Sequence, residues 1–280
     1  MKFGYTINNK LMMNSNGKLL CVEVNDPYNP LGLPPNTFRV RTNDGQPPNK
    51  IEFAEYDTAT LVEGTTDIYD VYKSGTDFKR LFHDSTNLIE VIGANTKGIT
   101  NIEYMFSYCP ALSSIPLFDT SNVTGFEAAF KRCKSLTSVP AYDTSNVTSM
   151  QWTFCDCSSL SSIPWFDTSN VTVMHGMLTD CSSLTSVPLY DTSNVVYMGG
   201  MLQNCTSITS LPLFDTSKAK DIGAAFLNCV NVQSGALDLY RQASTQTNPP
   251  MIHYSTFTNC GINTETGSAE LAQIPRDWKE

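Results

Sequence analysis

The sequence predicts a mainly β solenoid in which about seven coils of 24 residues stack between a small N-terminal β region and an α/β C-terminal cap. Two observations predict this fold. The phrase FDTSNVT begins at Phe118 and returns almost unchanged at Tyr142 and Phe166. Six cysteines also follow one another at intervals of 24 residues, namely Cys109, Cys133, Cys157, Cys181, Cys205 and Cys229. A fixed period of roughly 20–50 residues is typical of proteins built from stacked repeats.

The composition describes a globular chain whose surface carries few charges. Of its 280 residues 41% are hydrophobic, which is enough to form a core, and only 16% are charged. The net charge of −9, the pI near 4.8 and the absence of a Lys/Arg cluster argue against nucleic-acid and membrane partners. No apolar run predicts membrane insertion or a secretory signal. We therefore expect assembly in the cytoplasm, or a place on a virion or cell surface reached without a classical signal peptide.

Residues before the repeat predict two small β units. In residues 1–33, the run KLMMNSNGKLLCVEV has an Asn16-Gly17 turn signal between two strand-like segments, which predicts a hairpin that serves for attachment. The stretch PYNPLGLPPN, residues 27–36, is typical of a linker. Residues 34–77 predict a β region that caps the first coil. Its turns are expected at Asp44-Gly45 and Glu63-Gly64.

Residues 78–232 predict the solenoid itself, because apolar residues recur at fixed positions of the unit. One such column contains Leu88, Leu112, Leu136, Leu160, Leu184, Ile208 and Val232. A single unit is too small to bury all of its apolar side chains. Coils stacked about 4.8 Å apart bury each column against the same column in the next coil, so stacking is the expected source of stability.

The unit CSSLTSVPLYDTSNVVYMGGMLQNC, from Cys181 to Cys205, resembles the BspA-like leucine-rich repeats of bacterial surface proteins. Within that family it is most similar to the variant with a DTSNVT-x-M turn, and the resemblance extends from about Phe78 to Cys229. It implies a right-handed leucine-rich-repeat solenoid that serves in attachment and binding, without naming a ligand. The chain departs from the family in the length of its unit and in lacking the usual secretory signal.

The polar phrase predicts a corner of each coil. Asp and Asn side chains bond the backbone two residues on, and Ser and Thr do so more weakly. An alternative stays open, in which a column of carboxylates one strand spacing apart collects a hard cation such as Ca²⁺. Its members are Asp119, Asp143, Asp167, Asp191 and Asp215. Because a single column offers its oxygens in a line and Ca²⁺ takes them from several directions, we predict no metal and no cofactor.

The cysteine column predicts a ladder of buried, reduced thiols. Free Cys behaves as a small apolar residue and is among the most buried types. Strand spacing is compatible with disulfide geometry, but a chain without a secretory signal is expected to keep its thiols reduced. The pair Cys155 and Cys157 has neither the spacing nor the second pair of a zinc site.

Residues 233–280 predict the C-terminal cap. The stretch GALDLYRQAS, residues 235–244, has the clearest helical pattern in the chain. STFTNCG, which ends at Gly261, resembles a stretched last unit, and SAELAQIPRDWKE is helix-like. A cap is expected here because an open sheet edge invites pairing with another chain.

An aromatic residue opens the polar phrase of each coil and gives the first candidate binding surface. If Val187 and Leu189 point inward, strand alternation turns Tyr190 outward. The exposed column would then contain Phe118, Tyr142, Phe166, Tyr190 and Phe214. Such rings could stack on sugars or on a partner's side chains. Alternatively they stack on one another and cover the corner, and the proline of each coil shortens this strand.

Two tryptophans are further candidate contacts. Trp165 stands where sister coils carry Leu or Ala, and Trp152 stands in the column of Gly176 and Gly200. Each is either a local adjustment of the core or an exposed contact.

The sequence offers little for catalysis. Its three histidines, His83, His175 and His253, fall in different columns or outside the repeat, and no catalytic motif is present. We therefore predict a non-enzymatic binding or adhesion protein whose solenoid contacts a protein or glycan on a cell surface. One version is a bacteriophage tail, fibre or receptor-binding component. The alternative is a bacterial cell-surface adhesin, and an unrecognised hydrolase is the outside alternative.

Overall fold

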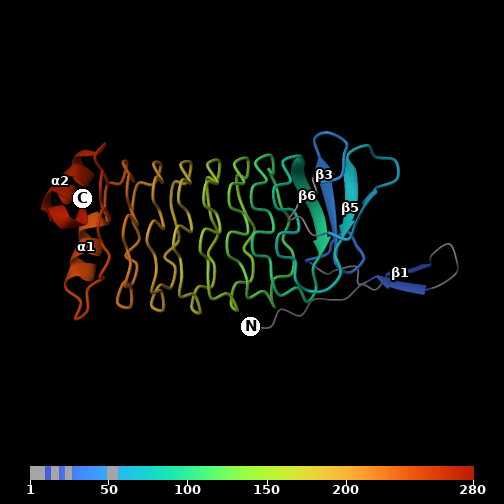
Figure 1. Cartoon of the computed structure of the whole chain (residues 1–280), viewed down its shortest axis with the longest axis horizontal. Helices are drawn as coiled ribbons and strands as arrows, with labels where there is room; N and C mark the ends of the chain where they lie inside the picture. The colour runs from blue at the N-terminus through green and yellow to red at the C-terminus, as the bar shows by residue number, and fades with distance from the viewer. Residues whose placement is uncertain (1–9, 14–18, 23–26, 49–55) are drawn as a thin grey trace.

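The computed structural model describes residues 10–13, 19–22, 27–48 and 56–280. Figure 1 shows a row of stacked coils with a β-sheet at its N-terminal end and two helices at its C-terminal end. The fold is mainly β with few helices, as predicted. Within the described ranges, no helix is long and apolar enough to cross a membrane.

The N-terminal hairpin is present. β1 (Lys10–Met13) pairs antiparallel with β2 (Leu19–Val22), as predicted, and the predicted Asn16-Gly17 turn between them lies outside the described residues. Among the described elements, these two strands contact only each other. The hairpin is therefore a unit distinct from the sheet that follows.

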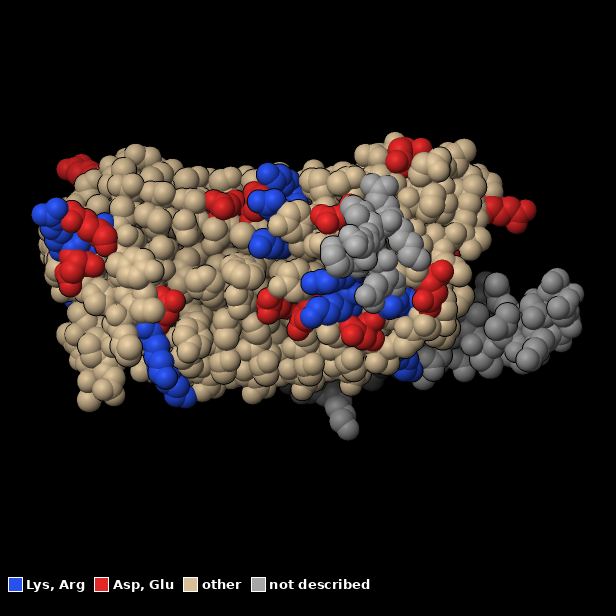
Figure 2. All heavy atoms as spheres, in the orientation of Figure 1, with Lys and Arg blue, Asp and Glu red and all other residues tan. Residues whose placement is uncertain are grey.

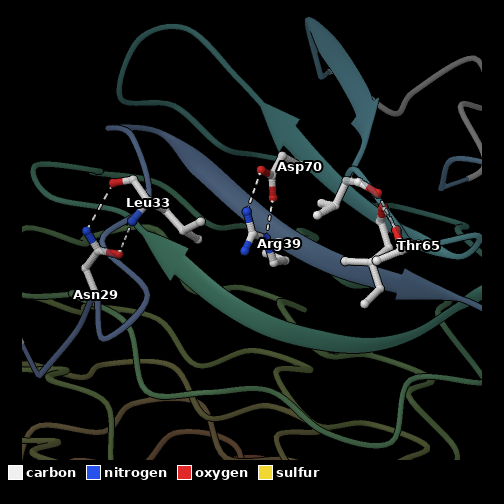
Figure 3. Close-up of polar contacts among 7 residues, drawn as sticks. Asn29, Leu33, Arg39, Thr65 and Asp70 are labelled. Carbon is white, nitrogen blue, oxygen red and sulfur yellow. Dashed lines mark hydrogen bonds and ion pairs between the residues drawn. The ribbon is translucent and has the colours of Figure 1, made fainter. Parts of the chain in front are cut away.

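A four-stranded antiparallel sheet, in the order β4-β5-β3-β6, covers the first coil. Its strands are β3 (Thr37–Thr42), β4 (Thr58–Leu61), β5 (Ile68–Tyr72) and β6 (Leu88–Asn95). Alternation along β3 buries Phe38 and Val40 completely. On the other face, Arg39 donates two hydrogen bonds to Asp70 across the strands, at 2.7 and 2.8 Å (Figure 3).

The two predicted turns are both found. Gly64 has φ of 79°, and the amide of Thr65 donates to the Val62 carbonyl, which closes the loop between β4 and β5. Gly45 has φ of 65°, and the Asp44 side chain accepts a hydrogen bond from the Gln46 amide. Positive φ at both positions explains why glycine follows the acidic residue.

β6 belongs to the sheet and to the solenoid together, so the two regions share one strand. One edge of β6 pairs antiparallel with β3, and Glu90 forms a parallel bridge with Ser114 of the next coil. This strand contains Leu88, which begins the apolar column predicted above. The sheet therefore continues the stack and leaves only its far edge, β4, without a neighbouring strand among the described residues.

The segment predicted to be a linker, residues 27–36, is instead packed against β6. Asn29 and Leu33 exchange two hydrogen bonds, at 3.1 and 2.8 Å (Figure 3), and Asn95 of β6 donates to the Leu33 carbonyl. Leu33 is buried. A Cβ atom at Gly93 would lie 2.5 Å from a methyl group of Leu31, so glycine allows this segment to approach the strand.

Successive coils are joined by parallel backbone pairing at one side of the unit. At one junction the amides of Ile102, Tyr104, Phe106 and Tyr108 donate to carbonyls 23 residues later, at 2.7–2.9 Å. Parallel bridges mark the same position coil after coil, through Asp77, Asn101, Gly125, Ser149, Val173, Tyr197 and Asp221. The 24-residue period of the sequence is thus a period of backbone contacts.

Each coil contains two residues in the left-handed backbone region within this paired segment. In one coil they are Trp152 and Asp156, with φ of 53° and 61°. Equivalent residues of the next coil are Gly176 and Asp180, with φ of 60° and 62°. Glycine, aspartate and asparagine tolerate this conformation best, which accounts for their recurrence here.

The apolar columns form one continuous core. Leu112, Leu136 and Leu160 are fully buried, and so are the phenylalanines of a second column. Neighbouring rings of that column stack at centroid distances of 5.4–5.5 Å, from Phe82 through Phe106 and Phe130 to Phe154. This arrangement is the like-on-like packing expected of stacked coils.

The C-terminal cap extends the stack by one interrupted coil. Helix α1 (Ala236–Ser244) lies where the sequence predicts it, and the amides of Ile222 and Ala224 then donate to carbonyls of Ile252 and Tyr254. The unit ending near Gly261 is therefore a stretched last coil, as predicted. Helix α2 (Glu265–Gln273) and the short 3₁₀ helix η1 (Arg276–Trp278) cover it. The hydroxyl of Thr264 caps α2 by accepting from the Gly267 amide, so the helix begins before the stretch predicted.

Candidate functional site

The polar phrase DTSN of each coil is structural, and its residues make different hydrogen bonds. The Asp167 carboxylate accepts hydrogen bonds from the amide and hydroxyl of Ser169, which fixes the corner. Thr168 donates to the Asp191 carbonyl of the next coil at 2.8 Å, and Asn170 donates to the Ser145 carbonyl of the previous coil at 2.7 Å. The predicted corner is confirmed, and the phrase also joins three coils.

The aspartate column shows no arrangement suited to a cation. Within the described ranges, no group of three or more His, Cys, Asp or Glu side chains could hold a metal ion. The hydrogen bonds from Ser169 lower the pKa of Asp167, and those from Ser193 lower the pKa of Asp191. These carboxylates are ordered by their own turns.

The predicted ridge of exposed aromatic rings is wrong. The column of Phe118, Tyr142, Phe166, Tyr190 and Phe214 is at most 3% exposed. Tyr190 points inward and donates its hydroxyl to the Pro164 carbonyl at 2.9 Å, whereas Leu189, which was expected inward, is 62% exposed. Pro188 removes a strand donor, no strand forms among residues 186–190, and simple alternation therefore fails there.

The residue before each buried ring forms an exposed apolar stripe. We define the apolar stripe as Trp165, Leu189 and Leu213, which occupy the same position in three successive coils and are 58, 62 and 53% exposed. A hollow of about 320 Å³ is lined by all three, together with Asp191, Ser193 and Asp215. A second hollow, of about 290 Å³, lies beside Trp165 and is lined by Ala141, Asp143 and Asp167. Trp165 is therefore an exposed side chain and not a local adjustment of the core, and its role in binding stays a prediction.

Trp152 has a different environment. Its side chain is half-buried and covers Gly176, where a Cβ atom would lie 2.5 Å from the indole. The ammonium group of Lys131 lies 4.6 Å from the ring centre, and His175 contacts the ring edge. Trp152 is thus part of a charged and aromatic surface, which explains why the next coil carries glycine.

That surface contains a basic patch, which we define as Lys131, Arg132 and Lys134. All three lie in one coil, in the sequence KRCK, and Figure 2 shows Lys and Arg gathered with Asp and Glu over the N-terminal half of the coils. Arg132 and Lys134 lie 3.5 and 3.3 Å from the Asp156 carboxylate. The statement that the chain lacks a Lys/Arg cluster is therefore wrong at this coil.

The cysteine ladder is confirmed as a row of buried free thiols. The six ladder cysteines are fully buried, and each thiol donates to a backbone carbonyl 27 residues earlier, at 3.0–3.2 Å. Burial raises the pKa of every ladder thiol, that of Cys229 to about 12. A thiol that stays protonated is a poor nucleophile, so these residues are structural.

Comparison with known protein families gives a match that covers the coils. The family described as "Mycoplasma protein of unknown function, DUF285" matches residues 76–162 and, in an overlapping second match, residues 125–238. Together the matches span more than half of the chain. The chain belongs to the DUF285 family. A comparison with curated proteins finds no match.

Two solved structures resemble the DUF285 chain. A leucine-rich repeat protein from Eubacterium ventriosum is 24% identical, with a TM-score of 0.40, and the match covers 59% of this chain and 39% of that one. A T. pallidum leucine-rich repeat protein is 17% identical, with a TM-score of 0.45, over 68% of this chain and 86% of that one. This chain spans about two fifths of the Eubacterium protein's length. Both are described as leucine-rich repeat proteins. The DTSNVT variant stays a prediction.

Sequence reasoning identified Trp152 and Trp165 but overlooked the leucines of the stripe and the basic patch. Leu189 was expected to point inward because the strand before it was expected to alternate regularly, and Leu213 occupies the same column. The basic patch had a visible signal, since KRCK is the only cationic version of this part of the repeat unit. Reading that column coil by coil would have found it.

Proposed function

We propose that this DUF285 chain is a non-enzymatic binding protein that contacts a protein or glycan partner through the apolar stripe. The observation that carries the proposal is the exposure of Trp165, Leu189 and Leu213, each more than half exposed, in three successive coils. Exposed apolar side chains in a contiguous row are typical of interaction sites, and Trp is enriched among residues that dominate binding energy.

The construction of the stripe supports this role. The stack below it is fixed by backbone pairing and by buried rings, so the exposed side chains are held on a rigid support. A rigid surface loses little conformational entropy on binding. We further propose that the coils form a right-handed solenoid of about seven units, which would present the stripe along one continuous face.

We propose that the chain does not act as an enzyme. His83 contacts Asp84 at 3.3 Å, and His253 contacts Asp277 at 3.6 Å. In the described part of the chain, none of the three imidazole rings bonds a Ser, Thr or Cys side chain, and the Thr256 hydroxyl donates to the backbone carbonyl of His253, so a nucleophile and its base are not paired. This supports binding over the hydrolase alternative.

For the setting in which binding occurs, we favour a bacterial surface protein. The matching family is described for Mycoplasma proteins, and both similar structures come from bacteria. This supports the adhesin alternative more directly than the bacteriophage tail component, for which the chain offers no separate observation.

The test uses the full chain on a glycan array and on a peptide array. We expect at least one ligand whose binding weakens about tenfold or more when Trp165, Leu189 and Leu213 are replaced together by Ser. Leu61→Ser is the matched control, because Leu61 is 47% exposed in strand β4, away from the stripe. Failure to bind either array, or binding that the triple substitution leaves unchanged, would overturn the proposal.

A further inference from the structure

The 320 Å³ hollow at the apolar stripe combines apolar walls with negative charge. All three residues of the stripe line it, together with Asp191 and Asp215, and no described Lys or Arg residue belongs to its lining. The 290 Å³ hollow has the same character, because Asp143 and Asp167 line it, again without a described cation. Trp165 lines both hollows, so the exposed indole is bordered by carboxylates on two sides.

The two carboxylates of the larger hollow are open to a cationic ligand. Each accepts a hydrogen bond from a backbone amide of its own turn, at 3.0 Å for Asp191 and 2.8 Å for Asp215. Hydrogen bonds from Ser193, and to a smaller extent the charge of Lys218, lower the pKa of Asp191, so this group is ionised at neutral pH. Lys218 lies outside the lining and donates its own hydrogen bond to Asn194, at 2.6 Å. Within the described structure neither carboxylate forms an ion pair.

A buried hydroxyl of the same hollow has no hydrogen-bond partner. Thr192 lines the hollow and is 1% exposed, and its hydroxyl is unpaired within the described structure. In the four preceding coils the equivalent hydroxyl donates to a backbone carbonyl of the next coil at 2.8–2.9 Å, from Thr96, Thr120, Thr144 and Thr168. A buried polar group without a partner costs free energy. The exception at this hollow indicates a partner that a ligand supplies.

The lining determines which chemical group fits. Carboxylates only accept hydrogen bonds and a hydroxyl can also accept, so a group with several N–H donors and a positive charge matches them best. Lysine and arginine side chains carry such a group on an apolar stem, which can pack on Trp165, Leu189 and Leu213. The indole face also attracts a cation. A neutral glycan lacks the charge, and an acidic glycan would be repelled.

We propose that a basic segment of a partner protein inserts a lysine or arginine side chain into this hollow. The stem of that side chain packs on the apolar stripe, and its cationic head donates to Asp191, Asp215 and the hydroxyl of Thr192. This inference rests on the proposed function, because it uses the same stripe, and it selects a protein over a glycan as the partner.

The test measures the binding of three short peptides to the full chain. The first peptide contains two leucines and two lysines among glycine and serine residues. The second has glutamine in place of each lysine, and the third has glutamate. We expect the lysine peptide to bind about tenfold more tightly than the glutamine peptide, and the glutamate peptide to bind most weakly. The preference for lysine should shrink in about 1 M salt, because the carboxylates are near the surface.

The decisive variant combines Asp191→Asn with Asp215→Asn, which should abolish the preference for lysine over glutamine. Asparagine keeps an oxygen that can accept the amide hydrogen bond of each turn, so the corners are retained. Asp119→Asn is the matched control and should keep the preference. Asp119 accepts the same turn hydrogen bonds, from Ser121, and lines neither hollow.

Thr192→Val tests the unpaired hydroxyl separately. We expect it to weaken binding of the lysine peptide several-fold, because one acceptor for the cation is lost. The thermal midpoint should stay unchanged or rise, because the hydroxyl makes no hydrogen bond in the unbound chain. Weaker binding of this variant therefore cannot be attributed to unfolding.

The outcomes separate this inference from the proposed function. Equal binding of the lysine and glutamine peptides, lost when Trp165, Leu189 and Leu213 are replaced together by Ser, would overturn the basic partner and leave the stripe as a binding surface. A preference for lysine that survives in the double asparagine variant would also overturn the inference. If none of the three peptides binds, the inference fails, and stripe-dependent binding of a glycan on the array would still uphold the proposed function.

Discussion

The four-stranded sheet and the stacked coils share strand β6, yet their polar groups are paired in different ways. In the sheet, unlike charges face each other across strands, as in the bidentate pair of Arg39 and Asp70 and in the pair of Arg41 and Glu90. In the coils, many buried polar groups are uncharged hydroxyls and thiols that bond the backbone of a neighbouring coil, such as Thr168 and Cys157. The sheet therefore uses ion pairs between side chains, whereas the coils rely more on hydrogen bonds from side chains to the backbone.

The difference follows from repetition. Neighbouring strands of a sheet have independent sequences, so a cation can be placed opposite an anion. Stacked copies of one unit place each residue beside its own kind at strand spacing, and a charged column would repel itself. Ion pairs between coils occur where the repeat varies, as between Lys79 and Glu103 and between Arg132 and Asp156. In the aspartate column, each carboxylate is held by hydrogen bonds within its own turn.

The largest expected effect that tests this comparison is unfolding at alkaline pH. Burial raises the pKa of the six ladder thiols, whereas unfolded thiols titrate near pH 8.5. The stability they contribute is complete below that pH and is lost as the pH rises from there toward the folded-state pKa. One unit above the unfolded pKa the loss is about 1.4 kcal/mol per thiol, hence several kcal/mol in all.

The measurement is the free energy of unfolding by urea between pH 7 and 10, under reducing conditions. Cys157→Ala provides the control, because it removes one of the six titrating thiols. The free energy of unfolding of this variant should fall with pH by about one sixth less than that of the parent chain. A free energy that stays level up to pH 10 would contradict the assignment of the ladder as buried and protonated.

A smaller effect separates two threonines at equivalent positions of neighbouring coils. Thr168 donates a hydrogen bond to the Asp191 carbonyl, whereas the hydroxyl of Thr192 is buried without a partner in the described structure. Thr168→Val should destabilise the fold by about 1–2 kcal/mol, because it leaves a carbonyl unsatisfied. Thr192→Val should be neutral or stabilising, because it removes an unpaired polar group.

Urea denaturation of both variants, read against the parent chain, distinguishes these outcomes. Equal losses of unfolding free energy in the two variants would show that the hydroxyl column contributes by packing alone. Hydrogen bonds from hydroxyl groups would then not distinguish the coils from the sheet.

The smallest effect is expected in the sheet. Arg39→Gln removes a pair whose side chains are about 30% exposed, and exposed pairs contribute only about 0.2–1 kcal/mol. The loss should shrink further in about 1 M salt, where charges are screened. A double-mutant cycle with Asp70→Asn measures the coupling, and a coupling above about 2 kcal/mol would mean that the sheet depends on charge far more than its exposure allows.

Much of the architecture could be predicted from sequence because the period determines which residues meet. The cysteine ladder, the stacked phenylalanines and the corners at Asp167 and its equivalents follow from the 24-residue spacing. Helix α1 followed from its own apolar pattern. These predictions required only that successive coils lie in register.

The direction in which each side chain points was harder to predict from the sequence. Tyr190 was expected to face the solvent and Leu189 the core, but the reverse is found. The proline before them prevents a regular strand. Periodicity carries no information about which way the backbone turns there. The residues of the linker-like segment 27–36 carry no repeat at all, and only the glycine opposite them in β6 allows their packing.

The sequence by itself determined that this chain stacks like on like, since identical residues at a fixed interval bury one another only in that arrangement. Tertiary structure decided which columns face water, and so placed the apolar stripe outside and the aromatic column inside. It also brought Tyr108 and Arg132 into contact at left-handed positions. The physical reason is that burial depends on backbone angles at a few prolines and left-handed residues, whereas the period depends only on spacing.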